Sequence, residues 1–89
     1  MKSTTAAPFW KHFAQLPLEV QRQAYKAYEL FSVNAAHPSL KFEEIDPTGR
    51  LWSARVSETY RVVGKRTGDE IRWFWIGMHN DCERFTGKH

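Results

Sequence analysis

The sequence predicts an α+β fold in which two N-terminal helices pack on one face of a three- to four-stranded antiparallel sheet. Apolar residues recur at helical spacing before Pro38 and at extended, alternating spacing after it. Helices therefore come first and strands afterwards, an order typical of a sheet covered by helices. The length of 89 residues suits one compact core, so residues 1–89 are expected to form a single domain.

Two helices are expected in the first part of the chain. Pro8 suits a first helical turn, and Phe9 and Phe13 follow at helical spacing until Leu16-Pro17 ends the segment. A second helix is expected at about 17–34, because its apolar residues form one stripe while its charged residues point elsewhere. Stripes of this kind usually belong to a core, so these aromatic residues are expected to cover the sheet rather than to hold a cofactor.

The rest of the chain is expected to form an antiparallel meander, whereas Met1 to Thr5 is expected to be loose. The predicted strands are residues 40–45, 51–56, 59–66 and 70–77. Asp46-Pro47-Thr48-Gly49 is a strong turn signal between the first two strands. A two-residue loop at Gly68-Asp69 is expected to join the last two.

Alternation along the last hairpin predicts which side chains share a face of the sheet. The residue pairs expected on one face are Arg61 with Ile76, Val63 with Phe74, and Lys65 with Arg72. The residues expected on the other face, under the helices, are Tyr60, Val62, Trp73 and Trp75. Arg55 joins Arg61 if Ser57 to Thr59 makes a three-residue turn, whereas a two-residue turn sends it to the helix side.

Composition excludes several classes of protein. Hydrophobic residues make up 42% of the chain and aromatic residues 15%, which is a globular composition with a dense core. A single cysteine, Cys82, excludes an intramolecular disulfide, so a reducing cytoplasm is the expected setting. We expect no signal peptide and no membrane span. The net charge of +3 is too modest to identify a nucleic-acid partner by itself.

Arg55, Arg61 and His79 are the first candidates for chemistry. Two guanidinium groups can hold a phosphodiester, and an imidazole can transfer protons near neutral pH. Cleavage of RNA needs no metal, because the ribose 2′-hydroxyl is an internal nucleophile. The alternative is that the strand arginines are solvated or paired with a carboxylate, for which the nearby acids are Glu58, Asp69 and Glu70.

Cys82 lies three residues after His79 and has three interpretations. A zinc site would need two more ligands, so no metal is expected. A thiol nucleophile would need activation by His79 and an oriented third group. Ordinary packing of a small, partly buried side chain is favoured.

Several strings, taken in order, resemble the RelE/ParE superfamily of bacterial toxins from type II toxin–antitoxin pairs. The strings are Phe9-Trp10, Leu16-Pro17, His37-Pro38-Ser39-Leu40, Ser53-Ala54-Arg55-Val56, Tyr60-Arg61-Val62 and Trp73-Phe74-Trp75-Ile76-Gly77-Met78-His79. The resemblance covers about Phe9 to Phe85 and implies a small sheet wrapped on one side by two helices, with RNA received on the opposite face. The superfamily includes ribosome-dependent messenger-RNA endoribonucleases and inhibitors of DNA gyrase.

The resemblance also implies roles for individual residues. Arg61 matches the arginine that stabilises the scissile phosphate in nuclease members, Arg55 matches a supporting basic position, and His79 matches a catalytic histidine that is a general acid or base. The cations expected to bind RNA are Lys41, Lys65, Arg72 and Arg84. The implied partners are an antitoxin protein and messenger RNA on the ribosome, with no small-molecule cofactor and no membrane.

Cys82 departs from the family pattern, which has an aromatic residue, usually tyrosine, three residues after the histidine. A thiol cannot stack on a base, so cleavage is expected to be feeble and Cys82→Tyr is expected to increase toxicity. The leading hypothesis remains a metal-independent messenger-RNA endoribonuclease with Arg61, Arg55, His79 and Cys82 at its site. The alternatives are a gyrase inhibitor, a degenerate toxin that only binds its antitoxin, and a soluble α+β domain with an unrelated role.

Overall fold

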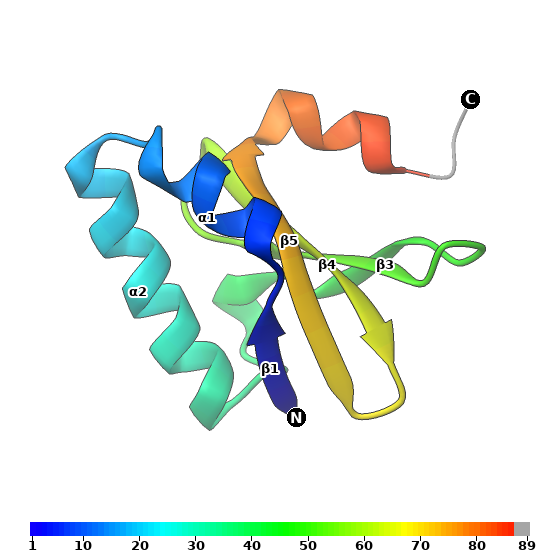
Figure 1. Ribbon diagram of the computed structural model, residues 1–89. Coiled ribbons are helices and arrows are strands. Elements are labelled where there is room, and N and C mark those ends of the chain that lie inside the picture. The colour runs from blue at the N-terminus through cyan, green and yellow to red at the C-terminus, as the bar shows by residue number, and fades with distance from the viewer. Residues whose placement is uncertain (87–89) are drawn as a thin grey trace.

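The computed structural model describes residues 1–86 and shows an α+β fold with a five-stranded mixed sheet (Figure 1). Its elements are β1 (Lys2–Thr5), α1 (Ala7–Ala14), α2 (Leu18–Val33), the 3-10 helix η1 (Pro38–Leu40), β2 (Glu43–Asp46), β3 (Leu51–Arg55), β4 (Tyr60–Thr67), β5 (Glu70–Met78) and the 3-10 helix η2 (His79–Phe85). The strand order is β1-β5-β4-β3-β2. The predicted fold class is confirmed, and the sheet has one more strand than expected.

The extra strand is β1, which the sequence analysis wrongly treated as loose. Lys2 to Thr5 pairs in parallel with Glu70 to Trp73 of β5. The Ser3 hydroxyl accepts a 2.7 Å hydrogen bond from Trp73 Nε1, and the Lys2 ammonium lies 3.7 Å from the Glu70 carboxylate. Partners almost seventy residues away fix this segment, so no local pattern could reveal it.

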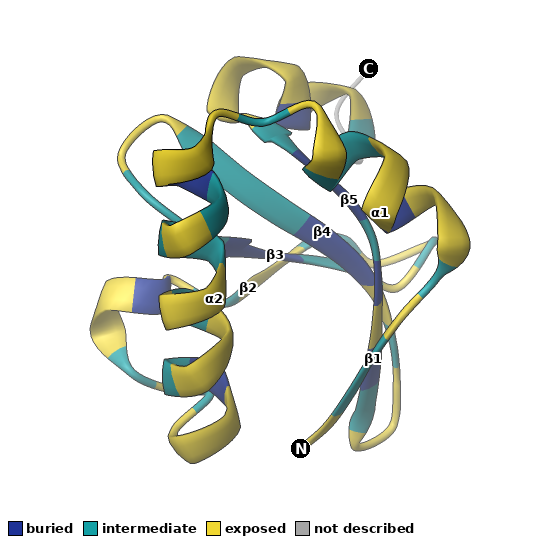
Figure 2. Ribbon diagram, turned by 60° about the vertical axis from the view of Figure 1, so that its left-hand side comes forward, coloured by how far each residue is buried: buried dark blue, intermediate teal, exposed yellow. Residues whose placement is uncertain are grey.

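The two long helices lie on one side of the sheet, and their outward surfaces are exposed (Figure 2). Pro17 separates them, as predicted, and is the N-cap of α2. The Gln21 side chain stabilises the connection between α1 and α2, because its amide donates hydrogen bonds to the carbonyl oxygens of Phe13 and Leu16 at 3.1 and 3.2 Å. No helix among the described residues is long and apolar enough to cross a membrane.

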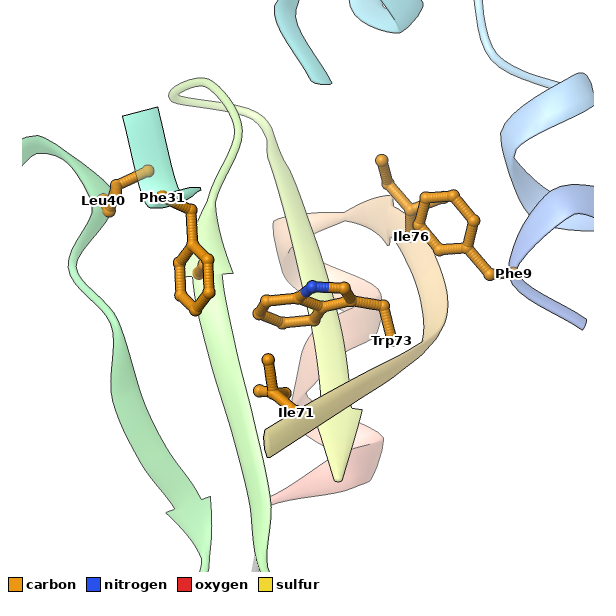
Figure 3. Close-up of a cluster of buried hydrophobic side chains, with 7 residues drawn as sticks. Phe9, Phe31, Leu40, Ile71, Trp73 and Ile76 are labelled. Carbon is orange, nitrogen blue, oxygen red and sulfur yellow. The ribbon is translucent and has the colours of Figure 1, made fainter. Parts of the chain in front are cut away.

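The main core lies between these helices and the sheet (Figure 3). Its buried residues are Phe9, Phe31, Leu40, Ala54, Ile71, Trp73 and Ile76. Phe31 meets Trp73 edge-on with ring centroids 5.5 Å apart, which is a favoured aromatic geometry. Leu40 belongs to η1 rather than to the strand predicted for residues 40–45, so β2 begins later, at Glu43.

The register of the last hairpin corrects part of the predicted facing. The two-residue loop and the pair Lys65–Arg72 are as expected, but a bulge follows at Val63/Gly64. Beyond this bulge the pairs are Arg61–Gly77, Val62–Ile76 and Val63–Trp75, one residue from the predicted register. The extra residue, Phe74, moves Trp75 to the face opposite the main core, so the expected place of Trp75 under the helices is wrong.

The second face of the sheet is partly covered by η2, which the sequence analysis did not predict as a helix (Figure 1, orange to red). Cys82 of η2 joins Val63 and Trp75 in a small buried cluster, and Phe85 lies against Trp75 with ring centroids 5.1 Å apart. On this side of the sheet η2 packs against β4 and β5. We call this second side the open face.

Candidate active site

Arg55 and Arg61 are direct cross-strand partners on the open face. Val56 and Ser57 both donate backbone hydrogen bonds to the carbonyl oxygen of Tyr60, at 3.1 and 3.2 Å, and close the connection between β3 and β4. This is the three-residue turn that places Arg55 beside Arg61. Their shared face, predicted on that condition, is confirmed.

Arg61 is half-buried and held by the backbone. Its Nη1 donates to the carbonyl oxygens of Ser57 at 2.6 Å and Tyr60 at 3.0 Å. Burial, and then the positive charge of Arg55, lower the pKa of Arg61 from its ordinary value, while Cys82 and Glu43 act in the opposite direction. A guanidinium has five N–H donors, so the remaining donors of Arg61 are available to an anion.

Glu43 is a site residue that the sequence analysis missed. It pairs with Ser53, which pairs with Val63, so Glu43 shares the open face with the two arginines. Its carboxylate is near enough to counteract the lowering of the Arg61 pKa. The β2–β3 register shifts between Glu44 and Asp46, so alternation counted from the turn at 46–49 would have placed Glu44 on this face, and no local signal identifies Glu43.

His79 begins η2 at the same end of the sheet. Its backbone N–H donates to the carbonyl oxygen of Thr59, and it follows Met78, the partner of Tyr60. The His79 side chain is exposed and makes no hydrogen bond within residues 1–86. His79 thus follows Gly77, the cross-strand partner of Arg61, by two residues along the chain.

Cys82 lies close to the arginine pair but inside the small cluster under η2. Its thiol is buried beside Val63 and Trp75. Burial raises the pKa of this thiol, the Arg61 charge opposes that rise, and Glu43 and Glu83 reinforce it. A thiol in such surroundings stays protonated at neutral pH, which suits packing better than nucleophilic attack.

The four cations expected to bind RNA are not gathered in one place. Lys65 and Arg72 are exposed cross-strand partners on the open face, four residues along β4 from Arg61, or about 13 Å. Arg84 stacks on Phe85 and Trp75, with its guanidinium carbon 4.9 and 5.6 Å from the ring centroids. Lys41 is exposed at the end of η1.

The structure therefore brings two arginines and one carboxylate to one face of the sheet, and the backbone of His79 lies at the same end. No group of three or more His, Cys, Asp or Glu residues that could hold a metal ion occurs in the described part of the chain. The arrangement offers donors for a phosphate together with two groups that can exchange protons.

Comparisons with known proteins identify the fold. No protein-family model matches the sequence, and no curated protein sequence matches it. Solved structures do match over almost the whole chain. RelE in a RelB–RelE antitoxin–toxin complex from Methanococcus jannaschii is 14% identical, with a TM-score of 0.72 over 92% of this chain and 96% of that one.

Two bacterial structures match with somewhat lower TM-scores. YafQ from E. coli strain BL21(DE3) is 16% identical, with a TM-score of 0.61 over 90% of this chain and 94% of that one. A chain of the heterotetrameric YoeB–YefM toxin–antitoxin complex from Staphylococcus aureus is 17% identical, with a TM-score of 0.63 over 89% and 97%. The protein therefore has the fold of the RelE/ParE toxins, as the order of its sequence motifs predicts.

Proposed function

We propose that this protein is the toxin of a type II toxin–antitoxin pair and that it cleaves messenger RNA in the ribosomal A site. The observation that carries the proposal is the Arg55–Arg61 pair on the open face of a RelE-type sheet. Two guanidinium groups side by side suit the extra negative charge that develops on a phosphate during cleavage. The place of action is then the cytoplasm, where the ribosome aligns the substrate.

The proposed reaction is transphosphorylation by the substrate's own 2′-hydroxyl. The 2′-oxygen forms a bond to phosphorus, the bond from phosphorus to the 5′-oxygen breaks, and the products are a 2′,3′-cyclic phosphate and a 5′-hydroxyl. In this scheme Glu43 accepts the 2′-hydroxyl proton and His79 protonates the leaving 5′-oxygen. Arg61 and Arg55 stabilise the charge on the phosphate, and no metal takes part.

Induced expression in growing bacteria tests this proposal. The parent chain is expected to arrest growth, and primer extension should map cleavages within translated codons. Arg61→Ala should lower cleavage about 100-fold or more, since it removes a donor to the charged transition state. Lys11→Ala, on an exposed position of α1, is the control and should remain toxic. Equal toxicity of Arg61→Ala and the parent chain, with both folded, would contradict the nuclease mechanism.

An antitoxin partner belongs to the same proposal, because the matching RelE and YoeB structures are toxin–antitoxin complexes. An apolar groove of about 340 Å³ runs between the helices and the sheet and includes the β1 strand. Trp10, Tyr25 and Tyr28 line it while 45%, 55% and 51% exposed, more than aromatic residues with their own packing partners usually are. An extended or helical antitoxin segment laid in this groove would cover them.

The reading frame next to the gene for this chain tests whether the chain has an antitoxin partner. A short adjacent gene for a DNA-binding protein is expected, and its product should form a stable complex with this chain. Tyr25→Asp should weaken the complex while the cleavage pattern stays unchanged, because the groove and the arginine pair lie on opposite faces of the sheet.

The second candidate is a toxin without nuclease activity, either a gyrase inhibitor or a chain that only binds its antitoxin. The observation that favours it is Cys82, which is buried where the family pattern has an aromatic residue. DNA damage with intact messenger RNA would support the gyrase inhibitor. Harmless expression together with tight antitoxin binding would support the degenerate toxin.

A further inference from the structure

A second hollow, of about 430 Å³, borders Arg55 on the way from β3 to α2. We call it the polar hollow, and its lining residues are Gln23, Lys26, Ala27, Leu30, Ser39, Leu40, Arg55, Val56 and Ser57. Its four α2 residues follow the spacing i, i+3, i+4 and i+7, so one face of that helix forms a wall. The opposite wall comes from the end of β3 and the turn that follows it.

Among residues 1–86, the lining is positively charged and contains no carboxylate. Its two charged residues are Lys26 and Arg55, and neither makes an ion pair or a side-chain hydrogen bond with any residue between 1 and 86. The Arg55 charge also contributes to lowering the pKa of Arg61, so the arginines repel each other. An anion in the polar hollow would relieve this repulsion.

Neutral groups of the lining also favour an anion. Ser57 Oγ accepts backbone hydrogen bonds from Thr59 at 3.3 Å and Tyr60 at 3.2 Å, so both lone pairs are occupied and its proton is free to donate. The Gln23 amide supplies further N–H donors. The Ser39 hydroxyl differs, because it lies 2.8 Å from His37 Nδ1, which also accepts the Ser39 backbone N–H.

Ser57 connects the polar hollow to the candidate active site. Its carbonyl oxygen accepts the 2.6 Å hydrogen bond from Arg61, and the same residue lines the hollow. We infer that the polar hollow binds a second phosphate of the RNA strand, a neighbour of the phosphate held by Arg61 and Arg55. This inference rests on the proposed function and extends it, because the strand then passes from the open face across Arg55 to the Lys26 side of α2.

Salt-dependent RNA binding tests the inference with the full chain. The probe is a fluorescein-labelled 2′-O-methyl oligouridine, which lacks the nucleophilic hydroxyl and is not cleaved. Lys26→Gln should reduce the slope of log affinity against log salt concentration by about 0.7, the value for one phosphate contact on a single strand. Lys26→Arg should retain the slope, and Lys11→Gln, an exposed lysine of α1, should leave it unchanged.

Different outcomes separate this inference from the proposed function. An unchanged slope for Lys26→Gln, or an equal reduction for Lys11→Gln, would overturn the second phosphate site even if Arg61→Ala abolishes cleavage. A reduced slope for Lys26→Gln alone would support the site even if Arg61→Ala still cleaves, and the nuclease mechanism would then be the part that fails. Failure of the parent chain to bind the probe would overturn the site. A Lys26→Gln defect confined to ribosomes without messenger RNA would assign the phosphate to ribosomal RNA and contradict the inferred substrate path.

Discussion

The two faces of the sheet differ in the residues that they carry. The helix-covered face holds the seven-residue core and most of the aromatic contacts, whereas the buried cluster of the open face consists of Val63, Trp75 and Cys82. The charged residues Arg55, Arg61 and Glu43 lie on the open face. The comparison indicates that the first face stabilises the fold and that the second can keep polar side chains exposed for binding.

This division makes physical sense for a chain of 89 residues. A core this small gains most from large aromatic side chains, which remove much apolar area from water. A rigid sheet then presents the side chains of its other face at fixed spacing, which a functional site requires.

The largest expected loss of folding stability comes from removing a core side chain of the helix-covered face. Trp73→Ala should destabilise the fold by about 3–5 kcal/mol, because the ring is buried against Phe31 and donates to Ser3. Urea unfolding followed by circular dichroism measures this change. Trp10→Ala, at a residue 45% exposed, is the matched control and should cost about 1 kcal/mol or less. Similar losses for both variants would contradict the assignment of stability to the buried core of the helix-covered face.

Two adjacent glutamates sharpen the comparison, because β2 sends them to opposite faces. Glu43 pairs with Ser53 on the open face, and Glu44 pairs with Trp52 on the helix side. Glu43→Gln should lower RNA cleavage about 100-fold, as expected for loss of a general base, with little change in stability. Glu44→Gln should cleave like the parent chain. Cleavage assays on translating ribosomes measure the difference, and equal activities would remove Glu43 from the mechanism.

A substitution at Gly77 tests whether the buried cluster around Trp75 and the arginine pair of the open face depend on each other. A Cβ added there would lie 2.5 Å from Trp75 Cζ2, so the indole must move. Gly77→Ala should therefore cost about 1–3 kcal/mol and also lower cleavage, because Gly77 is the cross-strand partner of Arg61. Thermal unfolding and cleavage measure both effects. Adding Trp75→Phe should recover part of the stability, and purely additive losses would show that the two residues are not coupled.

Local patterns were sufficient to predict much of this architecture. Pro17 ends the first helix, Gly68-Asp69 forms a two-residue loop, and the helices cover one side of the sheet. Alternation places Arg55 with Arg61 for one of the two turn lengths that the sequence left open, and the structure has that three-residue turn. These features depend on residues close in sequence or on a turn whose length can be counted.

The features that were missed depend on distant partners or on packing. β1 is fixed by pairing with β5 and by the Trp73–Ser3 hydrogen bond, and neither leaves a local signal. The bulge at Val63/Gly64 is a response to packing: a Cβ on Gly64 would lie 2.8 and 2.9 Å from the Trp73 and Ile71 side chains.

The burial of Cys82 results from the packing of η2 on the sheet, and this helix was also missed. This burial changes the expectation that Cys82→Tyr increases toxicity. A larger ring beside Val63 and Trp75 should destabilise the fold before it could aid catalysis.

The smallest expected effect is a dependence of stability on pH through Cys82. Burial raises the pKa of this thiol in the folded chain above its ordinary value, so the folded state keeps a proton that the unfolded state releases. Stability conferred by Cys82 is therefore fully present below about pH 8.5 and declines as the pH rises above it, by at most about 1.4 kcal/mol per pH unit.

Urea unfolding of the parent chain and Cys82→Ala between neutral and alkaline pH measures this contribution as the difference between their slopes. The parent chain should lose stability more steeply, while the groups common to both chains cancel. Arg61→Ala should steepen the decline further, because Arg61 is the positive charge that favours the thiolate in the folded chain. Parallel pH profiles for the parent chain and Cys82→Ala would mean that the thiol ionises as readily in the fold as in water. Cys82 would then belong to the accessible part of the open face rather than to its buried cluster.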